Sequence, residues 1–370
     1  MKIAICSPYD FSFPGGVQSH ISEFAKELIN KGHKVTIFAP LSDENIYEIQ
    51  YVDFFSLGKS FSFPFSGSVS RITLNLFKLI LCIKFLKQNK FDIVHLHEPL
   101  TPSQIIINLF LNKIKLIGTF HSYADKKNYI YIVFNKILIY FIKKLSIKIC
   151  VSKFSEIYIK RYFSFDSIII PNGINIENFS KSTNIPKKLN NDHKKILFVG
   201  RFDEKRKGFE ILLKSFINLK KTFHNLNLIV VGPGNKDKMK KYFTPPNYDK
   251  DIIFIGNITQ DKLPDYYKNV DLVCAPSIGN ESFGIILLEA MASGSVLIAS
   301  SIESYKHLLL KNNYGFLYNS NSSSQLNILI SKILLNQLST EENIKNGLKN
   351  VQNYSWEKIV SEIIKIYNKL

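Results

Sequence analysis

Two acidic residues, Glu281 and Glu289, stand eight positions apart in the segment 279–294. The apolar run at residues 271–276 predicts a strand before them, and the segment becomes helical near Phe283. Glu281 is therefore expected in a strand-to-helix loop, beside unpaired helix N–H groups that favour an anionic ligand. Glu289 follows among apolar helix neighbours. We interpret the two acids as partners for hydroxyls of a sugar or ribose; the alternative is a capping acid and a solvated surface residue.

A basic loop follows another predicted strand, at residues 195–200. Arg201 offers a planar fork and Lys207 a point charge, a combination suited to a diphosphate. The alternative is a solvated charged turn, which accounts well for residues 204–206 but poorly for Arg201.

Two glycines, Gly15 and Gly16, come after the first predicted strand, with a helix beginning near Val17. They allow the backbone to approach a ligand and place N–H donors at a helix start, as a phosphate site requires. A turn without a ligand is the alternative.

Histidines also end predicted strands. His121 is placed to hydrogen-bond a sugar hydroxyl or to polarise a reacting group, with a satisfied core histidine as the alternative. His95 and His97 share one face of a strand that is covered on both sides, so we interpret them as hydrogen-bonded core residues and assign neither a catalytic role.

The chain has 370 residues and a formal charge of +18, which favours anionic partners in general: nucleotide phosphates, acidic lipid or nucleic acid. Its 4 cysteines are widely spaced, so neither a zinc site nor a disulfide framework is predicted, and a reducing cytosol fits best. No run of about 18 uncharged apolar residues predicts a spanning helix.

Short apolar strands alternate with helical patterns along the whole chain, which predicts parallel sheets covered on both faces. We predict an α/β protein of two Rossmann-like, doubly wound domains, with a hinge near Pro171-Asn172-Gly173. The expected divisions are residues 1–172, residues 173–350 and a C-terminal helix, residues 351–370, that crosses back to the first domain. Ligands bind at the carboxyl ends of such strands, so a cleft between the two domains is the expected site. The predicted strands lie at residues 3–7, 35–40, 93–97, 116–121, 147–151, 195–200, 226–231, 252–256, 272–276 and 296–300, and a further apolar run, Ile168-Ile169-Ile170, leads into the hinge.

Together, these motifs resemble the retaining GT-B glycosyltransferases of family 4, over essentially the whole chain. They are Glu-x7-Glu before Ala-Met-Ala-x-Gly, Gly-Arg-x5-Lys-Gly, Pro-Gly-Gly-Val-Gln-x-His and Pro-Asn-Gly. Within that family the chain is most similar to bacterial phosphatidylinositol α-mannosyltransferases, because the stretch 67–71 follows Gly58-Lys59 as their acceptor loop does. The segments 119–121 and 200–204 also match.

The resemblance implies roles for the residues at the donor. Arg201, Lys207 and the backbone of Gly15 and Gly16 would hold the donor diphosphate. Glu289 would bind the ribose. Glu281, with the backbone at Ser282, Phe283 and Gly284, would hold the transferred hexose, and His121 would contact that hexose near the reacting carbon. No bound metal and no other cofactor is implied, because Arg201 and Lys207 stabilise the departing phosphate.

The acceptor side is expected in the first domain. Its predicted residues are Tyr9, Gln18, Phe65, Ser66, Ser68 and Arg71. The related acceptor loops carry Tyr-Asn before Gly-Ser-Val, whereas this chain has Phe65-Ser66, so contacts to an inositol phosphate head group differ here.

A basic, apolar segment at residues 71–90 predicts contact with an anionic membrane surface. On a helix, Lys84, Lys87 and Lys90 cover about 120° of one face, which suits an interfacial helix. The alternative is a core helix with a solvated lysine edge. Residues 129–145 repeat the pattern.

The sequence thus predicts a cytoplasmic enzyme, peripheral on the cytosolic face of the plasma membrane, that moves mannose from GDP-mannose to a lipid such as phosphatidylinositol. The alternative enzyme uses a UDP-sugar on another glycolipid, polyprenyl-linked or polysaccharide acceptor. A non-catalytic nucleotide or nucleic-acid binding protein is a third possibility, but no nucleic-acid module is recognisable. No obligate protein partner is inferred.

Overall fold

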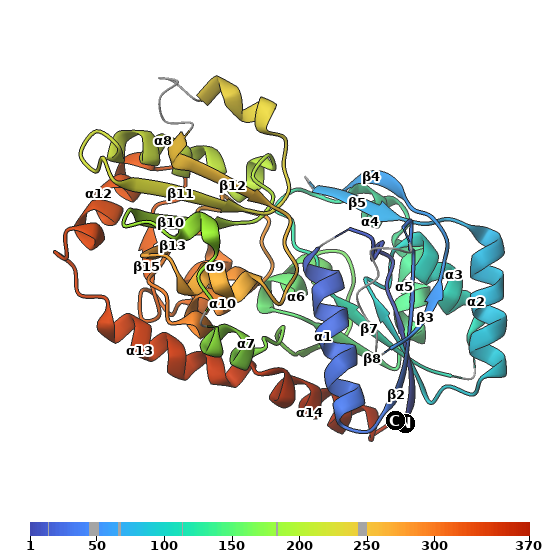
Figure 1. Ribbon diagram of the computed structural model, residues 1–370. Helices are drawn as coiled ribbons and strands as arrows, with labels where there is room; N and C mark the ends of the chain where they lie inside the picture. Colours follow the sequence, from blue (N-terminus) through green and yellow to red (C-terminus); the bar gives the residue numbers. More distant parts are fainter. Residues whose placement is uncertain (14, 44–51, 66–67, 113, 183, 243–249) are drawn as a thin grey trace. The chain divides into compact units, whose positions relative to one another are not determined.

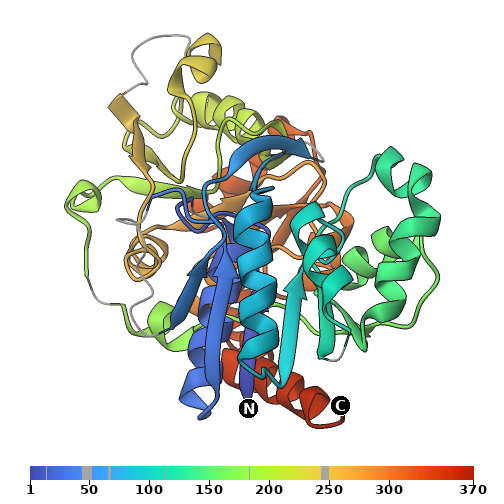
Figure 2. The same cartoon turned by 90° about the vertical axis from the view of Figure 1, so that its right-hand side faces the viewer.

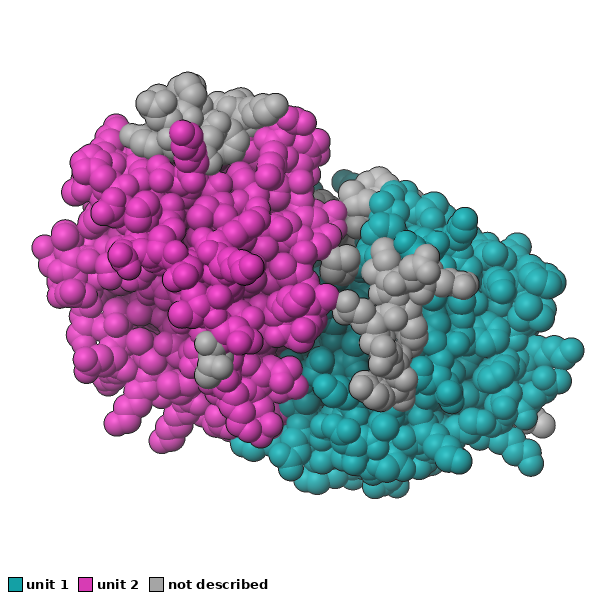
Figure 3. Space-filling view, viewed as in Figure 1, with its two compact units in different colours: residues 1–173, 356–370 teal, residues 174–355 magenta. Residues whose placement is uncertain are grey.

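A computed structural model describes residues 1–370 except 14, 44–51, 66–67, 113, 183 and 243–249 (Figure 1). The chain divides into two compact units, which are described separately (Figure 3). Unit 1 comprises Met1–Gly173 together with Trp356–Leu370, and unit 2 comprises Ile174–Ser355. The division thus falls after Gly173, and residues 351–355, expected in the returning segment, belong to unit 2.

Unit 1 is built on a parallel sheet with the strand order β3-β2-β1-β6-β7-β8-β9. Its strands are β1 (Lys2–Cys6), β2 (Lys34–Ala39), β3 (Asp53–Ser56), β6 (Ile93–His97), β7 (Lys115–Phe120), β8 (Ile147–Cys150) and β9 (Ile168–Ile169). Its helices are α1 (Gly16–Asn30), α2 (Leu76–Gln88), α3 (Pro102–Phe110), α4 (Tyr129–Val133), α5 (Asn135–Lys144), α6 (Lys153–Lys160) and α14 (Trp356–Tyr367).

Alternating residues of each strand feed two different cores. In β1, Ile3 and Ile5 pack with α1 and α14, whereas Ala4 and Cys6 pack with α2, α3 and α5. The sheet is therefore covered on both faces, as its continuous apolar strands require. Figure 2 looks onto the side of unit 1 on which α2 lies.

A small antiparallel hairpin, β4 (Phe61–Phe65) and β5 (Ser68–Ile72), joins the sheet to α2. Tyr9 forms an isolated antiparallel bridge with Ile72, so the hairpin is tied to the loop that follows β1. This hairpin was not predicted from the sequence.

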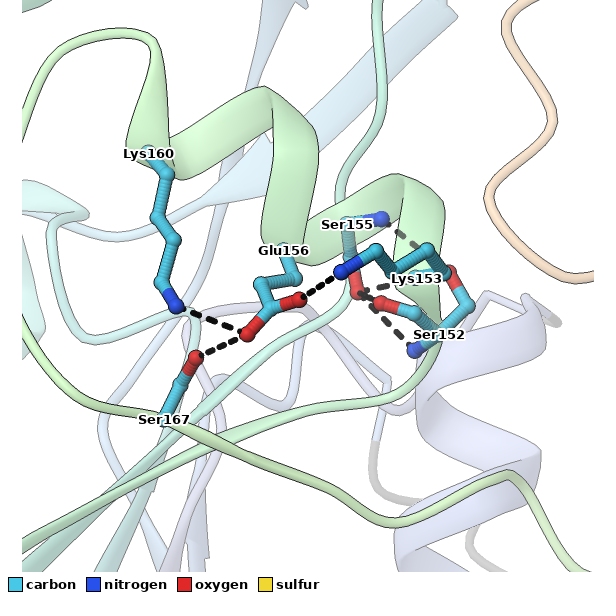
Figure 4. Close-up of polar contacts among 6 residues, drawn as sticks. All are labelled: Ser152, Lys153, Ser155, Glu156, Lys160 and Ser167. Atoms are coloured by element: carbon cyan, nitrogen blue, oxygen red, sulfur yellow. Dashed lines mark hydrogen bonds and ion pairs between the residues drawn. The ribbon is translucent and has the colours of Figure 1, made fainter.

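Helix α6 begins with a capping box after β8. The side chains of Ser152 and Ser155 each accept a hydrogen bond from the other's backbone N–H. Its Glu156 carboxylate contacts Lys160 at 2.8 Å, Lys153 at 2.9 Å and Ser167 at 2.8 Å (Figure 4). The Lys160 hydrogen bond is the main reason that the pKa of Glu156 is lowered to about 2, so this carboxylate stays ionised at neutral pH.

Unit 2 repeats the plan with the strand order β12-β11-β10-β13-β14-β15, again parallel. The strands are β10 (Lys194–Val199), β11 (Leu226–Val231), β12 (Ile252–Gly256), β13 (Leu272–Ala275), β14 (Leu297–Ser300) and β15 (Phe316–Tyr318). The α-helices are α7 (Ile176–Lys181), α8 (Phe209–Leu219), α9 (Leu263–Lys268), α10 (Ile285–Ser293), α11 (Glu303–Leu308), α12 (Ser323–Leu334) and α13 (Glu341–Asn350). Shorter 3-10 turns are η2 (Lys187–Leu189), η3 (Lys205–Lys207), η4 (Lys236–Tyr242) and η6 (Val351–Tyr354).

The predicted strands all form, each within a residue of its expected bounds. The doubly wound α/β class is therefore confirmed. Strands β3 and β15, two short strands at sheet edges, were not predicted from the sequence.

Candidate functional site

The loops after β10 and β13 lie side by side at the carboxyl edge of the second sheet, because these strands are parallel neighbours. The strand order reverses between them, and ligands of open α/β sheets bind at such a reversal. Gly208 adopts a φ of +68°, which glycine tolerates without strain. A Cβ at this position would lie 1.8 Å from the carbonyl oxygen of Pro276. The close packing joins the two loops into one site within unit 2.

Cations from the first loop hold the Glu281 carboxylate of the second. Its Oε1 atom lies 2.5 Å from Lys207 Nζ and 2.9 Å from Arg206 Nη1. Ser277 Oγ donates to the same oxygen at 3.3 Å. Although burial opposes ionisation, Lys207 and Arg206 hold the pKa of Glu281 below its usual value. Glu281 is therefore a fixed anion at neutral pH, in contact with a cation that can also serve a phosphate.

The residues between Arg201 and Lys207 do not form a wholly solvated turn. The Arg206 guanidinium bridges Glu204 at 2.9 Å and Glu281, and its side chain is only 20% exposed. Lys205 is the exposed member of this stretch. Arg206 is thus a site residue that the sequence analysis missed, because its partner Glu281 lies 75 positions away.

Arg201 stands directly after the sheet at Gly200 and is half-buried. Its guanidinium makes no ion pair within the described part of the chain, so its charge remains available to an anion. Arg201 and Lys207 thereby flank the same short loop, as the diphosphate hypothesis requires.

Glu289 lies in α10 and is buried, which rules out a solvated surface residue. Tyr267 Oη donates a hydrogen bond to its Oε2 atom at 2.6 Å. Burial raises the pKa of Glu289 to about 7, although Tyr267 and Lys207 both favour the ionised form. A buried carboxylate with one partner retains acceptor capacity for hydroxyl groups.

The raised pKa of Glu289 predicts a pH-dependent cost to folding. Between its usual value near 4.5 and about 7, the folded state binds more protons than the unfolded state, so stability falls as pH rises. Glu289→Gln should remove this cost, roughly 3 kcal/mol above pH 7, and change little near pH 4.5. Urea denaturation at both pH values measures the effect, with the exposed Glu303→Gln as control. Equal or lower stability of Glu289→Gln at pH 8 would contradict this account.

The start of α10 differs from the expected one. The helix begins at Ile285 rather than near Phe283, with Gly284 as its N-cap at a φ of +95°. The Tyr305 ring packs where a Cβ of Gly284 would stand, 2.7 Å away. Ser282 and Phe283 therefore lie in the loop between Glu281 and the helix, where their backbone can face a ligand.

In unit 1, Gly15 caps α1 and Gly16 is its first residue. A Cβ at Gly16 would meet no atom within 4 Å, whereas a Cβ at Gly15 would lie 2.5 Å from Gln18 Oε1. The role of this helix start in phosphate binding stays a prediction.

Tyr9, Gln18 and Arg71, expected at the acceptor, come together in unit 1. The Gln18 side chain donates to the carbonyl oxygens of Asp10 at 3.1 Å and Phe13 at 3.2 Å. The Arg71 guanidinium lies 3.7 Å from the centre of the Phe13 ring. Ser66 lies outside the described residues, and for Phe65 and Ser68 only the backbone, in β4 and β5, is described.

His121 follows β7 and is buried. Its backbone N–H donates to Glu98 Oε1 at 2.9 Å, and Ser122 Oγ donates to the same oxygen at 2.7 Å. Its Nε2 atom lies 2.8 Å from Nδ1 of His97. Glu98 and His97 therefore fix the position of His121. The contact between His97 and His121 was not predicted from the sequence, since it depends on the pairing of β6 with β7.

One Asp-x-Asp triplet, a motif that can bind metal ions, occurs at residues 249–251. Asp249 lies outside the described residues, and Asp251 pairs with Lys220 at 2.9 Å. Asp251 stands before the start of β12, at the amino ends of the parallel strands, whereas Glu281 and Lys207 follow the carboxyl ends of β13 and β10. Asp251 is therefore separate from the site.

Among the described residues, no helix is long and apolar enough to span a membrane.

Models of two glycosyltransferase families match the chain. The family described as "Glycosyltransferase Family 4" matches residues 14–178, and that described as "Glycosyl transferases group 1" matches residues 180–351. The two matches follow one another along the sequence.

Relatives that match over nearly their full length support the same family assignment. The phosphatidyl-myo-inositol mannosyltransferase of Mycobacterium leprae is 30% identical over 369 residues, which cover 99% of this chain and 96% of the relative. The protein of the same name from Mycolicibacterium smegmatis is 28% identical over 368 residues, with 99% and 93% covered.

Solved structures share the fold over the whole chain. Sucrose-phosphate synthase from Thermosynechococcus elongatus superposes with a TM-score of 0.80 at 20% identity, covering 100% of this chain and 98% of that one. Anabaena HepE in complex with UDP and glucose gives 0.79 at 17% identity, with 100% of both chains covered. The expected GT-B fold is confirmed.

Proposed function

Because the chain belongs to the family 4 glycosyltransferases, we propose that it transfers mannose from GDP-mannose to phosphatidylinositol, with retention of the anomeric configuration. The observation that carries the proposal is 30% identity to a phosphatidyl-myo-inositol mannosyltransferase over 99% of the chain. The donor, the acceptor and the stereochemistry are the proposed part.

The unit 2 site supports binding of a sugar nucleotide. Arg201 and Lys207 supply positive charge for the diphosphate, and this charge stabilises the leaving group as negative charge develops on it. Glu289 accepts from the ribose hydroxyls. Glu281, with the backbone of the following loop, accepts from the hexose hydroxyls. In this scheme the cations take the role that a divalent metal plays in other transferases.

The transfer itself proceeds on one face of the sugar. The acceptor hydroxyl attacks the anomeric carbon from the side of the departing phosphate, and a phosphate oxygen takes the hydroxyl proton. The bond between the anomeric carbon and the oxygen of the departing phosphate breaks as the new glycosidic bond forms. His121 binds the hexose near that carbon, and the neutral imidazole that burial enforces can donate one hydrogen bond.

Helix α2 supports peripheral attachment to an anionic membrane. Leu79, Cys82, Ile83 and Leu86 are buried on the sheet, so the helix has an ordinary core face. On its other side the apolar residues Leu76, Phe77 and Ile80 are 61%, 69% and 63% exposed. Lys84, Lys87 and Lys90 are exposed as well. A helix that was only a core element with a solvated edge would not expose large apolar side chains beside its lysines.

Helices α4 and α5 of the same unit carry a similar exposed surface. Helix α3 contacts both α2 and α5, and α5 contacts α4. Apolar side chains on α4, α5 and the residue between them are exposed: Tyr129, Ile130, Ile132, Val133, Phe134, Ile137 and Tyr140. Lys126, Lys127, Lys136 and Lys143 are exposed around them. The mixture of apolar and basic groups fits the head-group region of an acidic bilayer.

A second candidate is a transferase that uses a UDP-sugar or another lipid or polysaccharide acceptor. Phe65-Ser66 favours it, because these residues replace the Tyr-Asn expected for an inositol phosphate acceptor.

A panel of sugar nucleotides tests the proposal at the level of the donor. The protein should slowly release GDP from GDP-mannose, and phosphatidylinositol vesicles should accelerate the release. Release from UDP-sugars alone would favour the second candidate, and release from none would refute both.

Single substitutions separate the two acidic roles. Glu289→Gln should weaken GDP and GDP-mannose alike, by about tenfold, since a charged acceptor for the ribose is lost. Glu281→Gln should weaken GDP-mannose and spare GDP. Titration calorimetry with both ligands distinguishes the roles, and equal losses of GDP affinity in the two variants would refute the assignment.

A further inference from the structure

Four histidine rings gather at the carboxyl edge of the first sheet, where its strand order reverses between β1 and β6. His20 comes from α1, His95 and His97 from β6, and His121 from the end of β7. All four are buried. The His20 ring centre lies 4.8 Å from that of His121 and 5.4 Å from that of His97, and the His97 and His121 centres are 5.1 Å apart.

His95 differs from the other three because both of its ring nitrogens are occupied. Its Nδ1 lies 2.6 Å from Tyr367 Oη, and its Nε2 lies 2.6 Å from Thr119 Oγ1. These contacts explain His95 as a satisfied core residue, as the sequence analysis proposed.

The other rings are not satisfied in this way. His97 Nδ1 meets His121 Nε2, but His97 Nε2 is buried without a hydrogen-bond partner among the described residues. His20 Nδ1 is likewise buried without a hydrogen-bond partner among the described residues, although Asn172 hydrogen-bonds to the His20 side chain. Buried polar atoms in folded proteins are normally paired, so two unpaired imidazole nitrogens in one cluster point to an absent ligand.

We propose that His20, His97 and His121 form a binding site for a divalent transition-metal ion such as Zn²⁺. Each ring offers one nitrogen, and these three nitrogens lie within 4.8 Å of one another in the described part of the chain. Zn²⁺ takes imidazole nitrogens at about 2.0–2.1 Å, so tetrahedral coordination requires them roughly 3.3 Å apart. Binding therefore requires side-chain rotations that bring the three nitrogens to this spacing.

The surroundings of the rings suit such an ion. Burial lowers the pKa of all three, that of His20 to about 4, so each is the neutral form that binds metals. The three ligands leave a fourth position for water. Glu98 is not a ligand in this arrangement, because its Oε1 accepts from His121 N–H and Ser122 Oγ and holds the β7 end in place.

A bound ion would withhold His121 from the hexose. Zn²⁺ should therefore inhibit transfer in competition with the donor, a consequence that rests on the proposed function. The site itself does not rest on it, because the ion binds to unit 1 without donor or acceptor.

Titration calorimetry of the metal-free protein with Zn²⁺ is the direct test. The expected result is one saturable site, with Co²⁺ producing the visible absorption bands of four-coordinate cobalt at the same stoichiometry. His20→Asn and His97→Gln should each weaken binding by more than about 100-fold, since even outer-shell changes cost 10–100-fold. His95→Gln, on the same strand with both nitrogens engaged, and His224→Asn, on an exposed loop, should bind as the wild type does.

The site is refuted if the wild type lacks a saturable zinc site, or if His20→Asn and His97→Gln bind Zn²⁺ as tightly as the wild type. Circular dichroism checks that each variant is folded. If one of the two variants does not fold, the other still tests the site. Zinc inhibition of equal strength in wild type and His20→Asn would refute the competition with the donor. Failure of the proposed function has a different signature: no transfer by any variant, with zinc binding intact.

Discussion

Alanine in place of Lys207 or Arg201 is expected to lower turnover by about 100-fold or more while the fold persists. Each substitution removes a preorganised charge from the site where negative charge develops on the leaving diphosphate. The fold should survive because Glu281 keeps its Arg206 ion pair when Lys207 is lost, and because Arg201 makes no ion pair among the described residues.

Lys205→Ala is the matched control for this loss of charge. Lys205 belongs to the same 3-10 turn as Lys207 but is exposed, so its removal should leave turnover nearly unchanged. Steady-state kinetics on purified, folded variants measures the effect. Near wild-type activity of both Lys207→Ala and Arg201→Ala would refute their role, and a large loss in Lys205→Ala would point to general electrostatics instead.

Replacement of Lys84, Lys87 and Lys90 by serine is expected to lower affinity for acidic vesicles by roughly 100-fold. Each lysine near an anionic surface contributes on the order of 1 kcal/mol, and the three together give this factor if all face lipid. The salt dependence of binding should also become flatter, because fewer charged contacts remain. Donor affinity should not change, since the residues proposed to hold the nucleotide lie mainly in unit 2.

Lys26, Lys365 and Lys369 supply the control with the same change in charge. All three are exposed. Lys26 lies in α1, Lys365 in α14 and Lys369 just after α14, and these helices cover the face of the first sheet opposite to α2. Their replacement should lower vesicle affinity far less. Sedimentation with acidic and neutral vesicles at several salt concentrations decides the matter. An unchanged affinity of the Lys84, Lys87 and Lys90 variant would make α2 an ordinary core helix.

The sequence was sufficient to predict the elements that repeat a simple pattern. Continuous apolar runs such as those of β6 and β11 identify buried parallel strands, because both faces of these strands must be covered. The position of Glu281 and Lys207 after such strands then predicts a ligand site without any knowledge of their contact. Short edge strands such as β15 carry too few residues to show a pattern.

The missed features depend on residues that are distant in sequence. The Arg206–Glu281 ion pair exists because β10 pairs with β13. The start of α10 moves to Ile285 because Gly284 takes a left-handed conformation against Tyr305. His20 gave a weak local signal, as a polar residue beside Ile21 on the buried side of α1, but its meeting with His121 follows only from the sheet order.

Transfer of labelled mannose is the most direct test of the central claim. The protein is incubated with GDP-mannose and vesicles that contain phosphatidylinositol, and the lipid product is isolated and its glycosidic linkage determined. The account predicts a mannosylated phosphatidylinositol with an α linkage, formed by the wild type and about 100-fold more slowly by Lys207→Ala. A β-linked product would contradict retention, and an active donor reaction that never labels phosphatidylinositol would contradict the proposed acceptor.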